Sequence, residues 1–160
     1  CSPGNNVSMK ISELLSKEAI ISDLKSVNKA DTIKELASAV SNVTKASSDE
    51  IAAVLMEREK LGSTGIGGGI AIPHGKLDLI DSIVVGFGLS KAGVAYDSLD
   101  NKSVHIFFVL LTSENSTGDH LKVLAQISKL LKMDQFKQGL MRAQSLDDIY
   151  DIILEYVEEF

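Results

Sequence analysis

The sequence is poor in cysteine, in basic residues relative to acidic ones, and in long apolar runs. Its single cysteine, Cys1, cannot form an internal disulfide bond, which favours a reducing cytoplasm. The 16 lysines and arginines against 22 aspartates and glutamates leave a net charge of −6, which disfavours nucleic-acid binding because that function needs a basic face. No apolar run approaches the roughly 20 residues that cross a bilayer, so we expect no membrane insertion.

What remains is typical of one compact domain. The chain has 160 residues, of which 44% are hydrophobic, and this is enough for a sizeable core. Residues 1–8 are polar and irregular, and we interpret them as a leader or a cloning remnant before a natural start at Met9. We therefore assign a single domain to residues 9–160.

Helical and strand patterns alternate along the chain. Alternating or β-branched runs predict strands at 19–24, 83–89, 93–96 and 104–111. Apolar residues at helical spacing predict helices from Asp31, from a Ser47/Glu50 capping box and from Asp119, then two shorter helices at about 134–141 and 146–156. Helices interleaved with strands indicate an α/β layered sandwich.

The segment 62–75 is the least ordinary part of the sequence. It holds six glycines in 14 residues and one of the two prolines, so its backbone must adopt conformations that few other residues tolerate. Neither a Walker pattern nor a G-x-G-x-x-G register fits, which sets aside nucleotide binding in either standard form. Glycines let successive backbone N–H groups surround an anion beside His74, whose neutral imidazole is a competent phosphoryl acceptor. The alternative is an ordinary loop histidine after Pro73.

Arg58 and His120 are candidates for the same site. Leu55 lies four residues after Ile51 and Arg58 lies seven after it, so the Arg58 guanidinium belongs to a helix stripe otherwise turned toward the core. An internal carboxylate or a solvated head group would explain it, and so would a phosphoryl group beside His74. His120 falls in the first turn of a helix, where it is either a core histidine bonded to backbone or a donor to that phosphoryl group.

The third histidine, His105, raises the question of zinc. It lies within a predicted central strand beside Ile106 and Phe107, and we expect a structural role for it. No cysteine, H-E-x-x-H or H-x-x-x-H pattern supports a zinc site, so we expect no metal.

Four motifs stand in a specific order and spacing. They are Arg58-Glu59, Gly62-Ser-Thr-Gly-Ile-Gly, Gly69-Ile-Ala-Ile-Pro-His-Gly-Lys76 and Gly118-Asp-His-Leu-Lys122. Together they resemble the fructose/mannitol class (type 2) of enzyme IIA domains of the phosphotransferase system (PTS). Within that class, the Ser-Thr-Gly-Ile-Gly loop and segment 113–116 resemble the nitrogen-regulatory enzyme IIA most. Relatives often have Gly-Asn-Gly where this chain has Gly67-Gly68-Gly69, a change expected to loosen the loop.

The resemblance implies a PTS enzyme IIA domain over residues 9–160, built on a mixed sheet of about five strands covered by helices. It implies that His74 is phosphorylated, that Arg58 and His120 line the site, and that Thr64 supplies a supporting hydrogen bond. The donor would be the histidine phosphocarrier protein (HPr) or its nitrogen-branch counterpart. The chain would be a phosphotransferase component working through a phosphohistidine, without a cofactor.

Three functions remain open at this point. The first is a regulatory phosphocarrier that binds protein targets according to the phosphorylation of His74, because an added charge of roughly −2 alters a docking surface. The second is a transport component that passes phosphate to a IIB domain and so to fructose or mannitol. The third is an interaction module without phosphotransfer, and the presence of Arg58, His74 and His120 counts against it.

Overall fold

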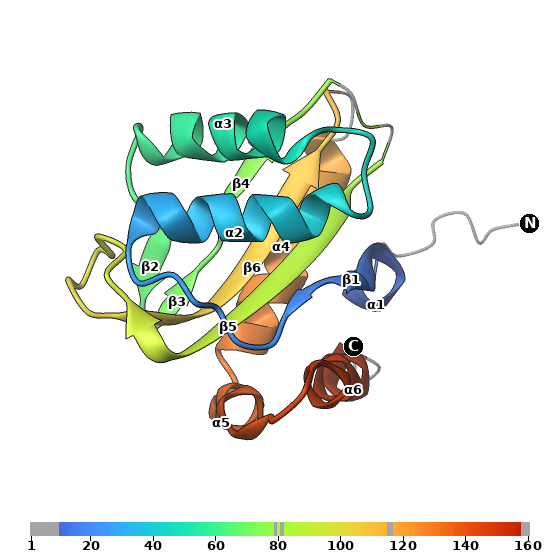
Figure 1. Cartoon of the computed structure of the whole chain (residues 1–160). Helices are drawn as coiled ribbons and strands as arrows, with labels where there is room; N and C mark the ends of the chain where they lie inside the picture. The colour runs from blue at the N-terminus through green and yellow to red at the C-terminus, as the bar shows by residue number, and fades with distance from the viewer. Residues whose placement is uncertain (1–9, 79, 81, 115–116, 158–160) are drawn as a thin grey trace, which may run out of the picture.

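The computed structural model describes residues 10–78, 80, 82–114 and 117–157 (Figure 1). Its elements, in chain order, are α1 (Ile11–Leu14), β1 (Leu15–Ile21), α2 (Lys29–Ser41), α3 (Ser48–Glu59), β2 (Gly65–Gly67), β3 (Ile70–Ala71), β4 (His74–Lys76), β5 (Val84–Val94), β6 (Val104–Thr112), α4 (Thr117–Leu131), α5 (Asp134–Arg142) and α6 (Leu146–Val157). The proposed leader, residues 1–8, lies outside the described residues, as do positions 115–116 of the segment 113–116.

The sheet is mixed, as predicted. Its strand order is β1-β5-β6-β3-β2, and β4 also pairs with β6. Strands β3 and β4 run parallel to β6 at successive positions along it, whereas β5 is antiparallel to β6. The described part holds six strands where about five were expected, because the glycine-rich segment forms three short strands and not only a loop.

The predicted separate strand at 93–96 is wrong. Strand β5 continues to Val94, with an irregular register between Leu89 and Val94. Gly93 has a positive φ of 96°, which lets the strand bend there without ending. The first strand also begins earlier than expected, at Leu15, because it pairs with β5 from that residue onward.

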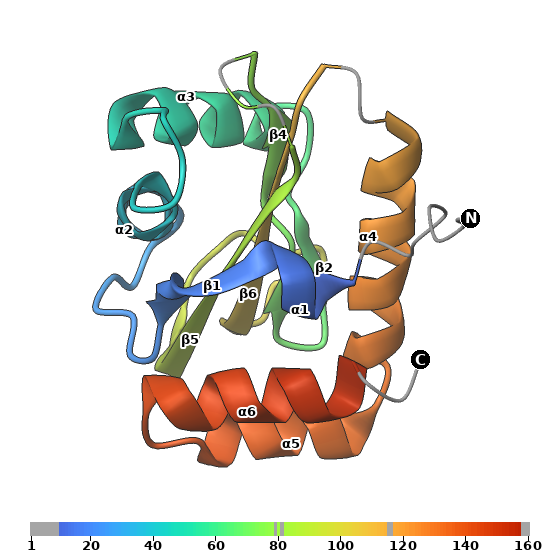
Figure 2. The ribbon, with the colours of Figure 1, turned by 90° about the vertical axis from the view of Figure 1, so that its right-hand side faces the viewer.

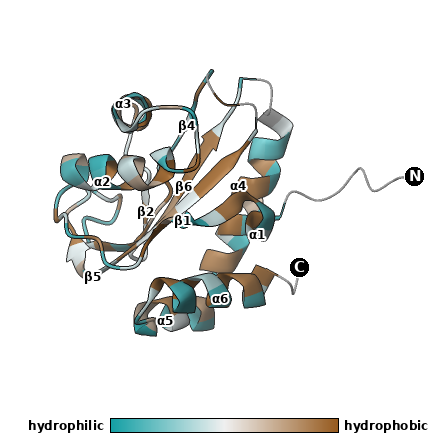
Figure 3. Ribbon diagram, turned by 45° about the vertical axis from the view of Figure 1, so that its right-hand side comes forward, coloured by the Kyte–Doolittle hydropathy of each residue, from teal (hydrophilic) through white to brown (hydrophobic). Residues whose placement is uncertain are grey.

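Each face of the sheet is covered by its own helices. Helices α2 and α3 lie over one face, α4 lies over the other, and α5 with α6 lies across the end next to α4 (Figure 2). Side chains of β6 alternate between two cores: Ile106, Phe108 and Leu110 contact the α4–α6 side, and Phe107 and Val109 the α2–α3 side. The apolar ribbon of β5 and β6 therefore runs through the centre of the molecule (Figure 3).

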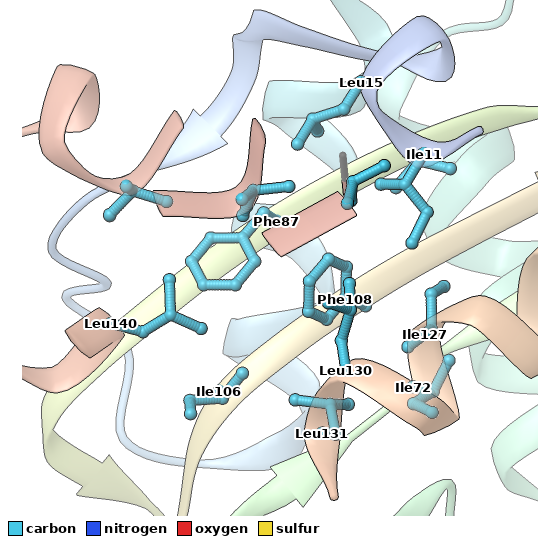
Figure 4. Close-up of a cluster of buried hydrophobic side chains, with 14 of the residues drawn as sticks. Ile11, Leu15, Ile72, Phe87, Ile106, Phe108, Ile127, Leu130, Leu131 and Leu140 are labelled. Atoms are coloured by element: carbon cyan, nitrogen blue, oxygen red, sulfur yellow. The ribbon is translucent and has the colours of Figure 1, made fainter. Parts of the chain in front are cut away.

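Aromatic packing fixes the larger of these cores. The rings of Phe87 and Phe108 meet edge to face, with centroids 5.0 Å apart (Figure 4). Leu130 and Leu131 of α4 pack against the same cluster. Leu121, which follows the same helical spacing of apolar residues, lies near the start of α4 and is 61% exposed.

None of the helices in the described ranges is long and apolar enough to cross a membrane.

Candidate functional site

Helix α3 carries Arg58 to the site. Its start is fixed by the predicted capping box, in which the Ser47 side chain accepts from the Glu50 backbone N–H and the Glu50 carboxylate accepts from that of Ser47. Ile51 and Leu55 are fully buried on one stripe of this helix. Arg58, further along the same side, is half-buried at the margin of the core.

Close packing brings α3 against β4, where His74 lies. A Cβ added to Gly75 would fall 2.4 Å from Cγ1 of Val54 on α3, so only glycine permits this approach without a shift. The short strand β4 is held by β6, in the register His74 to Leu110. The C-terminal turn of α3 and the beginning of β4 therefore lie next to each other.

Arg58 and His74 are in direct contact. Nε of Arg58 lies 3.3 Å from Nε2 of His74, and Nη1 of Arg58 donates to the Gly62 carbonyl at 2.8 Å. Nδ1 of His74 lies 2.8 Å from the Ile72 carbonyl oxygen. A carbonyl only accepts, so this geometry assigns the ring proton to Nδ1 and leaves the lone pair of Nε2 facing the hollow side of the ring.

His120 completes the pair of histidines. It belongs to the first turn of α4, and its ring meets that of His74 edge to face, with centroids 5.7 Å apart and an interplanar angle of 86°. Burial lowers the pKa of His120 below its usual value, and the nearby His74 and Lys76 lower it further. The ring is thus neutral at physiological pH and able to donate one hydrogen bond.

These three residues line one hollow of about 380 Å³. Its other walls come from α3, the residues just after it and β4: Val54, Glu57, Leu61, Gly75 and Lys76. Glu57 is paired with Lys60 at 2.7 Å, so Arg58 and Lys76 leave the hollow cationic. A small dianion such as a phosphoryl group would find donors on two sides there.

Thr64 lies in a different, buried cluster. Its hydroxyl donates to the Glu59 carboxylate and lies 3.2 Å from the hydroxyl of Tyr96, and its backbone N–H donates to Glu59 at 3.1 Å. The supporting hydrogen bond implied for Thr64 is therefore directed to Glu59 within the protein. Sequence reasoning missed Glu59 and Lys76, although Glu59 falls eight residues after Ile51, on the buried stripe of α3.

His105 has the structural role that was expected. Its Nδ1 lies 2.8 Å from the Ser90 carbonyl oxygen, and it belongs to the opposite end of β6 from the residues that pair with His74. Among the described residues, no three His, Cys, Asp or Glu side chains form a group that could hold a metal ion.

Comparison with known proteins identifies the family of the chain. Residues 13–156 match the family described as "Phosphoenolpyruvate-dependent sugar phosphotransferase system, EIIA 2". The chain is 35% identical to a nitrogen regulatory protein of Bradyrhizobium diazoefficiens over 145 residues, which is 91% of this chain and 95% of that protein. It is 36% identical to the fructose-specific EIIABC component of Bacillus subtilis over 149 residues, but spans only 24% of that longer protein.

A solved structure shares the same fold. The crystal structure of the nitrogen regulatory protein IIA-Ntr from Neisseria meningitidis superposes with a TM-score of 0.84 at 31% identity, covering 89% of this chain and 98% of that one. The family match over most of the chain, the two relatives and the shared mixed sheet lead to one conclusion. This chain belongs to the type 2 EIIA family of the phosphoenolpyruvate-dependent sugar phosphotransferase system.

Proposed function

We propose that this protein is a phosphocarrier that accepts a phosphoryl group on Nε2 of His74 from the histidine phosphocarrier protein or its nitrogen-branch counterpart. The observation that carries the proposal is the arrangement around one ring: the Ile72 carbonyl holds Nδ1, and Arg58 faces Nε2. Such an arrangement presents an unprotonated nitrogen to a donor, beside a permanent cation.

The chemistry balances without a metal or a proton transfer. The lone pair of Nε2 forms the new P–N bond while the P–N bond to the donor histidine breaks, and its electron pair returns to the donor ring. His74 then holds its Nδ1 proton against the Ile72 carbonyl, which stabilises the positive charge on the phosphorylated ring. Arg58 turns from Nε2 to a phosphoryl oxygen, and His120 donates from the other side.

We infer that the output is regulatory. The Bradyrhizobium relative, matched over nearly its whole length, is named a nitrogen regulatory protein. Exposed apolar side chains lie close to the hollow, with Leu61 83% exposed and lining it, and Leu121, next to His120, 61% exposed. A charge of roughly −2 on His74 would change the binding of a partner to that rim by repulsion and desolvation. We place this exchange in the cytoplasm, where phosphoenolpyruvate and the donor occur.

The direct test is phosphoryl transfer from labelled phosphoenolpyruvate through enzyme I and the phosphocarrier. We expect acid-labile label on the wild type and on His105→Gln, a matched control on the remote histidine, and none on His74→Ala. Label on His74→Ala would overturn the site assignment. No label on any variant with several donors would favour the interaction module.

A transport role is the second candidate, supported by the fructose-specific relative from Bacillus subtilis. In that case the phosphoryl group passes to a cysteine of a IIB domain. Chasing the labelled protein with such IIB domains separates the two roles, because a regulatory phosphocarrier keeps its label and a transport component loses it within the time of the chase.

A further inference from the structure

A buried carboxylate lies directly behind the candidate site. Glu59 is the last residue of α3, and its side chain is only 3% exposed. Nζ of Lys29 lies 2.8 Å from Oε1, and the Tyr96 hydroxyl donates to Oε2 at 2.9 Å. The Thr64 backbone N–H and hydroxyl donate to the same two oxygens. None of these groups lines the hollow beside His74.

The carboxylate is ionised in spite of its burial. Burial alone would raise the pKa of Glu59, but hydrogen bonds from Lys29, Thr64 and Tyr96 together outweigh it and hold the pKa below its usual value. Burial, followed by the neighbouring charge of Glu59, raises the pKa of Tyr96, which therefore stays protonated as a donor. A buried ion pair adds little net stability, because the cost of desolvation offsets the attraction between the charges. Stability alone therefore does not explain why Glu59 and Lys29 are paired here.

Two short hydrogen-bonded paths connect Glu59 to the site, one from its carboxylate to the His74 ring and one from its backbone carbonyl to Arg58. On the first, Thr64 is held by Glu59, the Thr64 carbonyl accepts from the Ile72 N–H at 3.0 Å, and the Ile72 carbonyl holds Nδ1 of His74 at 2.8 Å. This path sets the position of the Ile72 carbonyl, which selects the tautomer of the His74 ring.

The second path leads to the arginine. The Glu59 backbone carbonyl accepts from the Gly62 N–H at 3.0 Å, and the Gly62 carbonyl accepts from Nη1 of Arg58 at 2.8 Å. Gly62 and Thr64 are two residues apart, so anchoring Thr64 also restricts the carbonyl that orients Arg58. Both partners of the Arg58–His74 contact thus depend on the segment that Glu59 holds.

We infer that Glu59, bound by Lys29 and Tyr96, is a positioning residue for phosphoryl transfer. It fixes Thr64, and through Thr64 the His74 tautomer and the Arg58 head group, without touching the phosphoryl group itself. This inference rests on the proposed function of His74. It predicts that loss of the carboxylate reduces the rate of transfer more than it reduces binding of the donor.

The test compares Thr64→Val, which removes the hydroxyl with little change of shape, with Thr64→Ser, which keeps it, and with Glu59→Gln. Ser47→Ala is the matched control, because it weakens the start of α3 and leaves the Glu59 cluster intact. We expect kcat for phosphorylation to fall about 10- to 100-fold in Thr64→Val and Glu59→Gln, with KM for the donor within about twofold, as small displacements in a site do. Thr64→Ser should restore most of the rate.

Nitrogen-15 NMR of the imidazole supplies a readout independent of transfer. The wild type should show His74 predominantly protonated on Nδ1, and Thr64→Val should show a mixture of tautomers. The inference is overturned if Thr64→Val keeps both the wild-type tautomer and the rate of Ser47→Ala. Should the wild type take no label, the proposed function fails, while the tautomer comparison still decides whether the Glu59 cluster positions the ring. If Glu59→Gln does not fold, the comparison of Thr64→Val with Ser47→Ala still tests the inference.

Discussion

Nε of Arg58 lies 3.3 Å from Nε2 of His74, although the two residues are 16 positions apart and belong to a helix and a strand. An arginine N–H that faces a histidine nitrogen donates to its lone pair and holds a fixed positive charge where a phosphoryl group would arrive. The contact depends on the α3–β4 packing and on the Gly62 carbonyl that holds the other end of the guanidinium.

Removal of this guanidinium is expected to slow phosphorylation without abolishing it. Arg58→Ala should lower the single-turnover rate on the order of 100-fold, because one preorganised donor to the transferring group is lost. Arg58→Lys should recover only part of the rate, since a lysine has no planar fork to bond Gly62 and the phosphoryl group together.

The matched control for this experiment is Arg142→Ala. Arg142 is an exposed arginine of α5, on a helix that does not line the hollow. Its replacement should leave the rate unchanged within about twofold. An Arg58→Ala rate equal to that of Arg142→Ala would remove Arg58 from the site.

Close approach of α3 to β4 makes Gly75 sensitive to added volume. Gly75→Ala should destabilise the fold by about 1–3 kcal/mol, because the new Cβ would fall 2.4 Å from Cγ1 of Val54. Adding Val54→Ala should relieve the clash, so that the effects of the two changes on the free energy of unfolding, measured by urea denaturation, are strongly non-additive. Simple additivity at positions 75 and 54 would contradict the packing argument.

The control is Gly139→Ala on α5, where an added Cβ would have no packing neighbour nearer than 3.8 Å. This change should instead raise the free energy of unfolding by about 0.5–1 kcal/mol, because alanine favours a helix more than glycine does.

Local patterns predicted the elements that position the site. The Ser47/Glu50 capping box was visible in the sequence because its partners are three residues apart, and the long apolar run of β6 predicted a central strand. The motif order predicted that Arg58, His74 and His120 belong together, and the structure places them around one hollow. These features could be predicted because they depend on residues close together in the sequence or on a motif shared by a family.

The partners of Glu59 could not be predicted in the same way. Lys29 is 30 positions before it and Tyr96 is 37 after it, so only the folded sheet brings them together. The helical spacing puts Glu59 on the buried stripe of α3, but it carries no information about which cation lies beside the carboxylate. The three short strands β2, β3 and β4 were missed for a related reason, since their hydrogen bonds to one another and to β6 leave no alternating pattern in a glycine-rich segment.

The turn between β2 and β3 gives a prediction about residue type. Gly68 has φ of 67° and nothing within 4 Å of an added Cβ, so conformation alone decides which residue is tolerated. Gly68→Ala should cost about 1 kcal/mol, the penalty of a left-handed conformation for an ordinary residue. Gly68→Asn should cost much less, because asparagine visits this region readily. Thermal unfolding of the two variants checks this, and equal costs would show that the turn does not keep this conformation in solution.

The titration of His120 reports on the charge beside it. Burial, His74 and Lys76 hold its pKa below the ordinary value of 6.5, so between that lowered pKa and 6.5 the unfolded chain binds more protons than the folded one. This residue's contribution to stability is therefore full above pH 6.5 and is lost as the pH falls toward the folded pKa.

A dianionic phosphoryl group on His74 should reverse that shift. Phosphorylation places a negative charge of roughly −2 near the His120 ring. This charge stabilises the protonated imidazole and therefore raises the pKa of His120. We expect NMR titration to give a midpoint below 6.5 in the unphosphorylated protein and a clearly higher one after phosphorylation. His105, held by Ser90 at the other end of β6, serves as the internal control, and its ring signals should not respond to phosphorylation. An unchanged His120 midpoint after complete labelling would mean that the phosphoryl group does not lie between the two rings.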